Sequence, residues 1–149
     1  MEFKETLTWD TRQNIQNAEV TKAALKTIVG FLNTKGGTLL IGVADSGKMS
    51  GVNLEIEKLH KSNTDKFLLS LKNLLKDRIG AQYYPFIGVS LINADGVFIV
   101  RINCKTSNEP CFLLTGKGGN KVEEFYVRAP AATDKLEGRE MLKFIDANF

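Results

Sequence analysis

Residues 31–47 read FLNTKGGTLLIGVADSG and hold the most apolar predicted strand of the chain. The pattern indicates the end of a helix, a Lys-Gly-Gly break, a buried strand that runs to Val43 and a turn that exposes Asp45. The two glycines let the helix end sharply and let the next backbone pass without side chains in the way. Because Asp45 and Gly47 supply turn chemistry, a second strand is expected after the Ser-Gly corner.

A short strand is expected at the start of the chain. The segment EFKETL, residues 2–7, alternates Phe3 with Glu2 and Lys4, which is the period-two pattern of a half-buried strand. Glu2 and Lys4 then share one face of that strand. If this strand lies beside the buried strand described above, Asp45 comes close to both residues at one end of the sheet.

Three segments have the apolar spacing of helices. After a polar loop, residues 19–34 carry apolar side chains at intervals of three and four. A second apolar stripe runs through residues 63–78, where Asn63 or Thr64 can cap the first turn. We interpret this stripe as core. Residues 136–149 are expected to close the chain as a short amphipathic helix.

Two hairpins account for the remaining strands. Residues 83–105 predict two strands joined at NADG, one of the strongest short hairpin signals. Residues 110–129 predict two more around the glycine-rich, basic loop GKGGNK. Helices mixed with hairpins predict an α+β fold with a mixed or largely antiparallel sheet and about three helices. No repeat or low-complexity linker divides the chain, so residues 1–149 are expected to form a single domain.

The composition limits the classes of function. The 149 residues are 43% hydrophobic and 25% charged, with a net charge of +3, which allows an anionic partner without requiring one. The start of the chain has neither a basic leader nor an apolar run, and the longest apolar stretches are too short to cross a bilayer. A soluble, cytoplasmic protein without a membrane partner is expected.

Several chemical motifs fail when their residues are checked. DSGKMS contains Gly-Lys, but a phosphate-binding P-loop needs Ser or Thr directly after the lysine, where Met49 stands. GKGGNK lacks the spacing of a dinucleotide fingerprint. Cys104, Cys111 and His60 cannot supply four zinc ligands, and an intracellular setting argues against a disulfide. Both cysteines are therefore interpreted as strand residues, and no organic cofactor is indicated.

Four segments occur along the chain in the order EFK, FLNTKGGTLLIGVADSGKMSGV, EPCFL and FYVRAPAATDKLEGREM. Together they cover roughly residues 2–145 and resemble the AlbA-type domain of Schlafen-related proteins. The resemblance implies an α+β fold that binds nucleic acid, either RNA or DNA. For the Schlafen members that cut tRNA and rRNA, it further implies a metal-dependent endoribonuclease site built from three acidic residues.

The resemblance assigns Glu2, Lys4 and Asp45 as the catalytic set. Glu2 and Asp45 would hold a magnesium or manganese ion, and Lys4 would offset phosphate charge. The family's nucleases have another acidic residue a few positions before Glu2, which this chain does not contain, and Glu5 is a poor substitute because alternation points it the other way. The chain is therefore expected either to be a piece of a longer protein or to keep a binding surface without the full metal site.

Basic residues in loops and at strand ends can reach a phosphate backbone without disturbing the core. The residues predicted to bind nucleic acid are Lys35, Lys48, Lys105, Arg128, Thr133 and Lys135. Arg128 belongs to a YVR segment that recurs in the family pattern, and Thr133 could add a hydroxyl contact.

Three hypotheses of function follow. The first is a nucleic-acid-binding module, and the second is a metal-dependent endoribonuclease that acts on structured RNA such as tRNA. The third is a protein-interaction domain that forms a homo-oligomer through its sheet, with the basic residues incidental. An acidic residue upstream of Glu2 would favour the second over the first.

Overall fold

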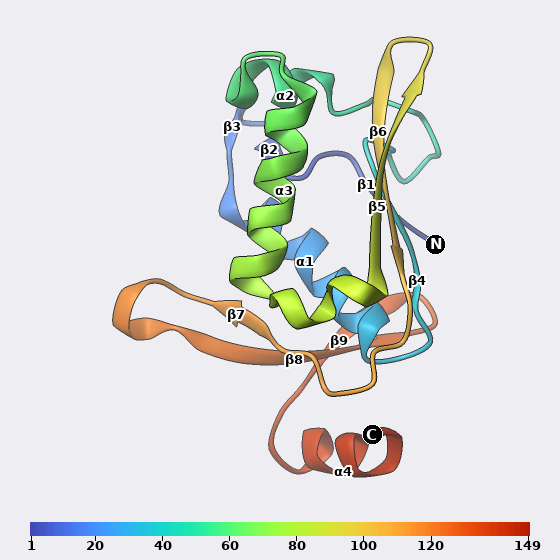
Figure 1. Cartoon of the computed structure of the whole chain (residues 1–149), viewed down its shortest axis with the longest axis vertical. Helices are drawn as coiled ribbons and strands as arrows, with labels where there is room; N and C mark the ends of the chain where they lie inside the picture. Colours follow the sequence, from blue (N-terminus) through green and yellow to red (C-terminus); the bar gives the residue numbers. More distant parts are fainter.

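The chain folds into three β-sheets and four α-helices (Figure 1), and the computed structural model describes all of residues 1–149. The strands are β1 (Glu2–Lys4), β2 (Trp9–Asp10), β3 (Ile15–Gln16), β4 (Gly37–Ile41), β5 (Ile87–Ala94), β6 (Val97–Cys104), β7 (Leu113–Thr115), β8 (Val122–Ala129) and β9 (Ala132–Leu136). The helices are α1 (Ala18–Leu32), α2 (Asn53–His60), α3 (Thr64–Arg78) and α4 (Gly138–Asn148), with the 3₁₀ helices η1 (Ala81–Phe86) and η2 (Gly118–Asn120). Helices mixed with hairpins confirm the predicted α+β class.

The largest sheet, called the main sheet below, has the strand order β1-β4-β6-β5. β1 runs parallel to β4, whereas β4 and β5 both pair with β6 in antiparallel fashion. Helix α1 lies between the two parallel strands in the chain, since a parallel pair needs a crossover connection. The main sheet is therefore mixed, as predicted, and it sets β1 beside the buried strand that the glycine break introduces.

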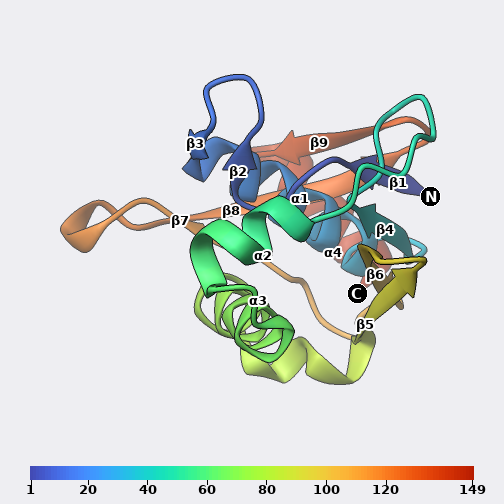
Figure 2. The ribbon, with the colours of Figure 1, turned by 90° about the horizontal axis from the view of Figure 1, so that it is seen from above.

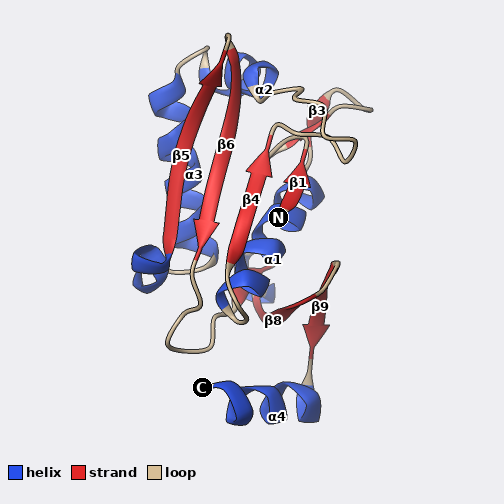
Figure 3. Ribbon diagram, turned by 90° about the vertical axis from the view of Figure 1, so that its right-hand side faces the viewer, coloured by secondary structure: helices blue, strands red, loops and turns tan.

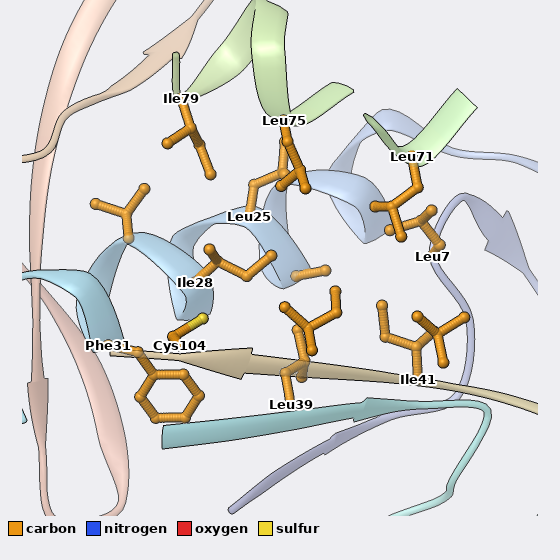
Figure 4. Close-up of a cluster of buried hydrophobic side chains, with 14 of the residues drawn as sticks. Leu7, Leu25, Ile28, Phe31, Leu39, Ile41, Leu71, Leu75, Ile79 and Cys104 are labelled. Atoms are coloured by element: carbon orange, nitrogen blue, oxygen red, sulfur yellow. The ribbon is translucent and has the colours of Figure 1, made fainter. Parts of the chain in front are cut away.

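One face of the main sheet carries the hydrophobic core (Figure 4). Leu39 and Ile41 of β4 and Ile102 of β6 are fully buried, because alternate side chains of a strand point to the same face. They belong to a cluster of 22 buried residues that includes Ile28 of α1 and Leu71 of α3. Figure 3 shows these helices behind the sheet, while the opposite face is turned to the viewer and carries no helix.

Close approach explains the glycine break after α1. Gly36 has a φ of 74°, in the left-handed region, and a Cβ there would lie 2.4 Å from the carbonyl oxygen of Cys104. A Cβ on Gly37 would lie 2.5 Å from the ring of Phe31. The two glycines therefore end the helix and let β4 pass close to its neighbours, as the sequence predicts.

Two of the predicted elements form where local signals are strong. Asn63 caps α3 by accepting a hydrogen bond from the backbone N–H of Lys66 at 3.0 Å. The NADG turn joins β5 to β6, and both Asp95 and Gly96 have positive φ angles.

The segment after β4 differs from the prediction. Instead of a second strand, Val43 and Met49 form an isolated bridge around the exposed turn that contains Asp45. The chain then enters α2, which the sequence did not predict. This helix has eight residues, buries only Glu55 and Ile56, and has no side-chain cap, so its apolar period is too short to recognise.

Three further expectations need correction. Cys104 ends β6, but Cys111 lies in the loop before β7 and not in a strand, although both thiols are free and buried. There are four α-helices and not about three. The short β2–β3 ribbon and the mostly polar β9 were missed because neither shows a clear apolar alternation.

A buried carboxylate fastens α2 to the start of the chain. Glu55 is 1% exposed and accepts hydrogen bonds from the backbone N–H groups of Leu7 and Thr8, both at 2.8 Å, and from the Thr8 hydroxyl at 2.6 Å. A carboxylate is tolerated in the interior when donors satisfy its oxygens, and these three donors do so. Glu55 thus holds the segment that follows β1 against the helix that follows the Asp45 turn.

The β7–β8–β9 sheet packs beside α1, and its β7–β8 hairpin projects from the body of the molecule in Figure 2. Helix α4 follows this sheet and has no buried residue. The ring of Phe144 in α4 lies 5.9 Å from the ring of Phe125 in β8. None of the helices has both the length and the apolar character needed to span a membrane.

Candidate nucleic-acid interface

Glu2 lies at the edge of the main sheet and is paired with a cation from another sheet. Its register opposite Leu39 puts it on the core-facing side of β1. Its Oε2 lies 2.7 Å from Nη2 of Arg128, while Nη1 of Arg128 donates to the hydroxyl of Thr133 at 2.9 Å. The guanidinium also lies over the ring of Phe31, 5.4 Å from its centroid. Arg128 therefore links β1, α1, β8 and β9.

Neighbouring cations control the ionisation of Glu2. Burial raises the pKa of its carboxyl group, but the hydrogen bond from Arg128 and the charges of Lys4 and Arg128 outweigh burial, so the pKa is lowered overall. Lys4 acts on Glu2 because residues two apart in a strand share a face. Glu2 is therefore a carboxylate at neutral pH, with positive charge on two sides.

Lys4 connects β1 to the turn that carries Asp45. The carbonyl oxygen of Lys4 accepts hydrogen bonds from the N–H groups of Gly42 at 2.7 Å and Val43 at 3.1 Å. Asp45 is exposed two residues farther along the chain. The end of β1 and the start of this turn are thus joined through backbone hydrogen bonds.

The same turn has the glycine spacing of a phosphate-binding loop, with Gly42, Gly47 and Lys48. Two features separate it from such a loop. Met49 follows the lysine, and no helix begins until Asn53, whereas a phosphate-binding loop leads directly into a helix N-terminus. The turn is therefore not a triphosphate-binding loop.

The side chains of the domain do not form a ligand set for the metal ion that the resemblance implies. No group of three or more His, Cys, Asp or Glu side chains comes together in a way that could hold a metal ion. In Glu2, Oε2 accepts from Arg128 and Oε1 accepts from the backbone N–H of Phe3. The residues present do not fit a magnesium or manganese site of three carboxylates, and metal binding by Glu2 and Asp45 stays a prediction.

Two of the predicted basic residues come together where α1 ends and β6 ends. Lys35 stands before the glycine break, and a Cβ on Gly36 would lie 3.2 Å from Cα of Lys105. The Thr106 hydroxyl also donates to the carbonyl oxygen of Thr34 at 2.6 Å, which ties the two segments together. Both lysines are exposed and neither forms an ion pair. We call Lys35 and Lys105 the lysine pair.

The other predicted basic residues lie elsewhere. Lys48 is exposed in the turn at the opposite end of β4. Lys135 forms ion pairs with Glu124 and Glu137, each at 2.9 Å, and Thr133 is bonded to the arginine described above. Lys48 has no carboxylate partner, whereas the exposed Lys135 and the half-buried Thr133 are already held by partners within the domain.

Arg101, an exposed cation in the middle of β6, is not among the residues predicted from the sequence. Its neighbours Val100 and Ile102 are fully buried, so Arg101 points away from the core. The signal was present in VFIVRINC, whose alternation puts Arg101 and Asn103 on the solvent side. Glu55 had no comparable signal, because its partners lie 47 and 48 residues away in the sequence.

The sequence model of one protein family, Schlafen, AlbA_2, matches residues 1–137. The chain belongs to the Schlafen AlbA_2 family. The matched residues of this Schlafen AlbA_2 domain include the main sheet and continue through β9, but they stop before α4. No curated protein matches the sequence of the domain.

The solved structures that are similar to this Schlafen AlbA_2 domain include a crystal structure of a much longer protein. The crystal structure of the DIP2311 protein from Corynebacterium diphtheriae aligns with a TM-score of 0.59 at 18% sequence identity. The alignment covers 99% of the present chain and 24% of that chain, so the Schlafen AlbA_2 domain spans less than a third of the neighbour's length. At this identity the likeness shows the fold alone.

Proposed function

We propose that this Schlafen AlbA_2 domain binds nucleic acid through exposed lysines. The lysine pair is the observation that carries the proposal, since it brings two unpaired cations together from separate parts of the chain. Of the twenty Lys and Arg residues, only Lys22, Arg128 and Lys135 form ion pairs. Exposed cations without carboxylate partners attract a phosphate backbone, and the family resemblance supports the same ligand.

The proposal predicts salt-dependent binding that weakens when Lys35 and Lys105 are both replaced by alanine. Each lost phosphate contact should reduce the magnitude of the slope of log K against log salt by about 0.7 to 0.9. The slope measured for the double variant should therefore be smaller in magnitude by about 1.5. The measurement is fluorescence anisotropy with labelled RNA and DNA oligonucleotides at several salt concentrations.

The matched control is the double variant Lys66→Ala and Lys72→Ala, which removes two exposed lysines of α3 and changes the net charge equally. It should bind like the original chain. An equal loss of affinity in both double variants would reduce the effect to net charge alone, and binding that does not respond to salt would contradict the proposal.

The second hypothesis, a metal-dependent endoribonuclease, is not favoured by a comparable observation. Arg128 occupies an oxygen of Glu2, and no group of three acidic side chains is assembled. Digestion of tRNA that needs magnesium or manganese and is abolished by Asp45→Ala would establish it.

A further inference from the structure

The face of the main sheet that points away from the helices is open (Figure 3). The pairing register lines up one side chain from each strand across this face. Phe3 lies opposite Leu40, Leu40 lies opposite Arg101, and Arg101 lies opposite Ser90. All four are exposed or half-buried, and the row is about 14 Å wide, because neighbouring strands lie about 4.8 Å apart.

A second row lies beside the first and carries polar groups. Thr38 lies opposite Asn103, and Asn103 lies opposite Gly88. The Thr38 hydroxyl donates to Oδ1 of Asn103 at 2.9 Å, which leaves the amide NH₂ of Asn103 free to donate. Around Gly88 there is space, since a Cβ there would meet only the carbonyl oxygen of Asn103, at 3.9 Å. Toward the β5–β6 turn the face closes, because the outward Ile99 is 5% exposed.

The open face is cationic. The four strands contain a single acidic residue, Glu2, which lies on the core-facing side and is paired with Arg128. Arg101 is exposed and forms no ion pair, and Lys105 of the lysine pair follows directly at the end of β6. A face with free cations, one aromatic ring and no carboxylate suits a ligand that has both negative charge and flat apolar rings.

We propose that this open face binds single-stranded nucleic acid, with Arg101 and Lys105 on backbone phosphates and with Phe3 and Leu40 beneath the bases. The inference rests on the proposed function and names the class of nucleic acid. The bases of a single strand are free to stack on an aromatic ring and to meet a donor such as the Asn103 amide. A duplex keeps its bases stacked inside, so it gains only the phosphate contacts.

Charge argues against a second copy of the chain as the occupant. In a twofold pairing of two such faces, each contact is repeated with the partners exchanged. The pairing would bury the Arg101 side chains of both copies, and neither open face has a carboxylate to offset their charge. An anionic strand has the opposite charge and is the better complement.

The test is the affinity of the full chain for a labelled oligouridylate of about 12 nucleotides, within the span of known single-strand sites. Arg101→Glu should weaken binding about tenfold or more, because it reverses a charge on the face. Phe3→Leu should weaken binding about fivefold, because leucine keeps the apolar bulk but offers no aromatic ring for stacking. Lys72→Glu on α3 makes the same charge change on the helix side and should bind like the original chain.

Each outcome decides the inference. The inference is supported if a duplex of equal length binds more weakly than the single strand, and if Arg101→Glu and Phe3→Leu lose affinity while Lys72→Glu does not. The variants must also unfold at the same temperature as the original chain. If RNA binds but both face variants bind normally, the open face is not the site and the proposed function stands. If neither the single strand nor the duplex binds, both the inference and the proposed function are contradicted. If Arg101→Glu instead changes the sedimentation of the protein alone, the face is a self-association surface and the inference is overturned.

Discussion

Arg128 ties the edge strand β1 of the main sheet to the β7–β8–β9 sheet. Its guanidinium contacts the carboxylate of Glu2, the hydroxyl of Thr133 and the ring of Phe31. The ring itself occupies the space that a side chain at position 37 would fill, which explains why Gly37 stands there. Gly37 in β4 therefore leaves room for the Phe31 ring, and this ring packs under the guanidinium of Arg128 that pairs with Glu2 of β1.

Replacing Arg128 should destabilise the fold even when the charge is kept. Arg128→Lys should cost about 1 to 2 kcal/mol, because one ammonium group cannot bond Glu2 and Thr133 while stacking on Phe31. Arg128→Ala should cost about 2 to 3 kcal/mol, because Glu2 is left without its partner. Urea unfolding measures both. The exposed Lys121→Ala is the control, and an Arg128→Ala variant as stable as Lys121→Ala would show that the pair contributes nothing.

At the scale of elements, the side chain of Glu124 in β8 connects this strand to α1 and β9. Its Oε1 lies 3.3 Å from Nζ of Lys22 in α1 and accepts from the Tyr126 hydroxyl at 2.9 Å, while its Oε2 lies 2.9 Å from Nζ of Lys135 in β9. Burial raises the pKa of Glu124, but the hydrogen bonds from Lys135, Tyr126 and Lys22 lower it to about 2. The side chain thus ties α1 to the β8–β9 hairpin as a carboxylate.

This ion-pair network should make stability depend on pH in the acid range. Because the pKa of Glu124 is lower in the folded chain than its usual value of 4.5, its contribution is present above pH 4.5 and is lost as the pH falls toward 2. Glu124→Gln should therefore cost about 2 kcal/mol at pH 7 and much less at pH 2.5. Urea midpoints at both pH values measure this, with the exposed Glu123→Gln as control. A cost that is equal at both pH values would rule out the charge as its source.

The elements also show what could be predicted from the sequence. Helix α3 and the β5–β6 hairpin were expected because their signals, an Asn63 cap with a leucine stripe and the NADG turn, are local. Helix α2 was missed because eight residues give too short a period. The pairing of Glu2 with Arg128 could not be foreseen, because 126 residues separate them and no spacing rule reaches that far.

At the scale of the whole molecule, the main sheet separates two tasks. One face carries the buried core under α1 and α3, and the other face carries Arg101 and the polar row of Thr38 and Asn103. Lys35 and Lys105 were predicted singly, from their places in loops and at strand ends, whereas their proximity and the open face become visible only in the fold. A strand residue such as Arg101 becomes recognisable only when the register shows which residues stand beside it.

Helix α4 stands apart from this arrangement, so its removal should leave the rest intact. The family match covers residues 1–137 and ends before α4, which buries none of its residues. Its ring contact places Phe144 against the buried Phe125. A chain shortened to residues 1–137 should keep one cooperative urea transition and its nucleic-acid affinity, and should lose about 1 to 2 kcal/mol as Phe125 becomes exposed. Phe144→Ala in the full chain is the matched variant and should cost nearly the same. Loss of the cooperative transition in the shortened chain would instead make α4 part of the folding unit.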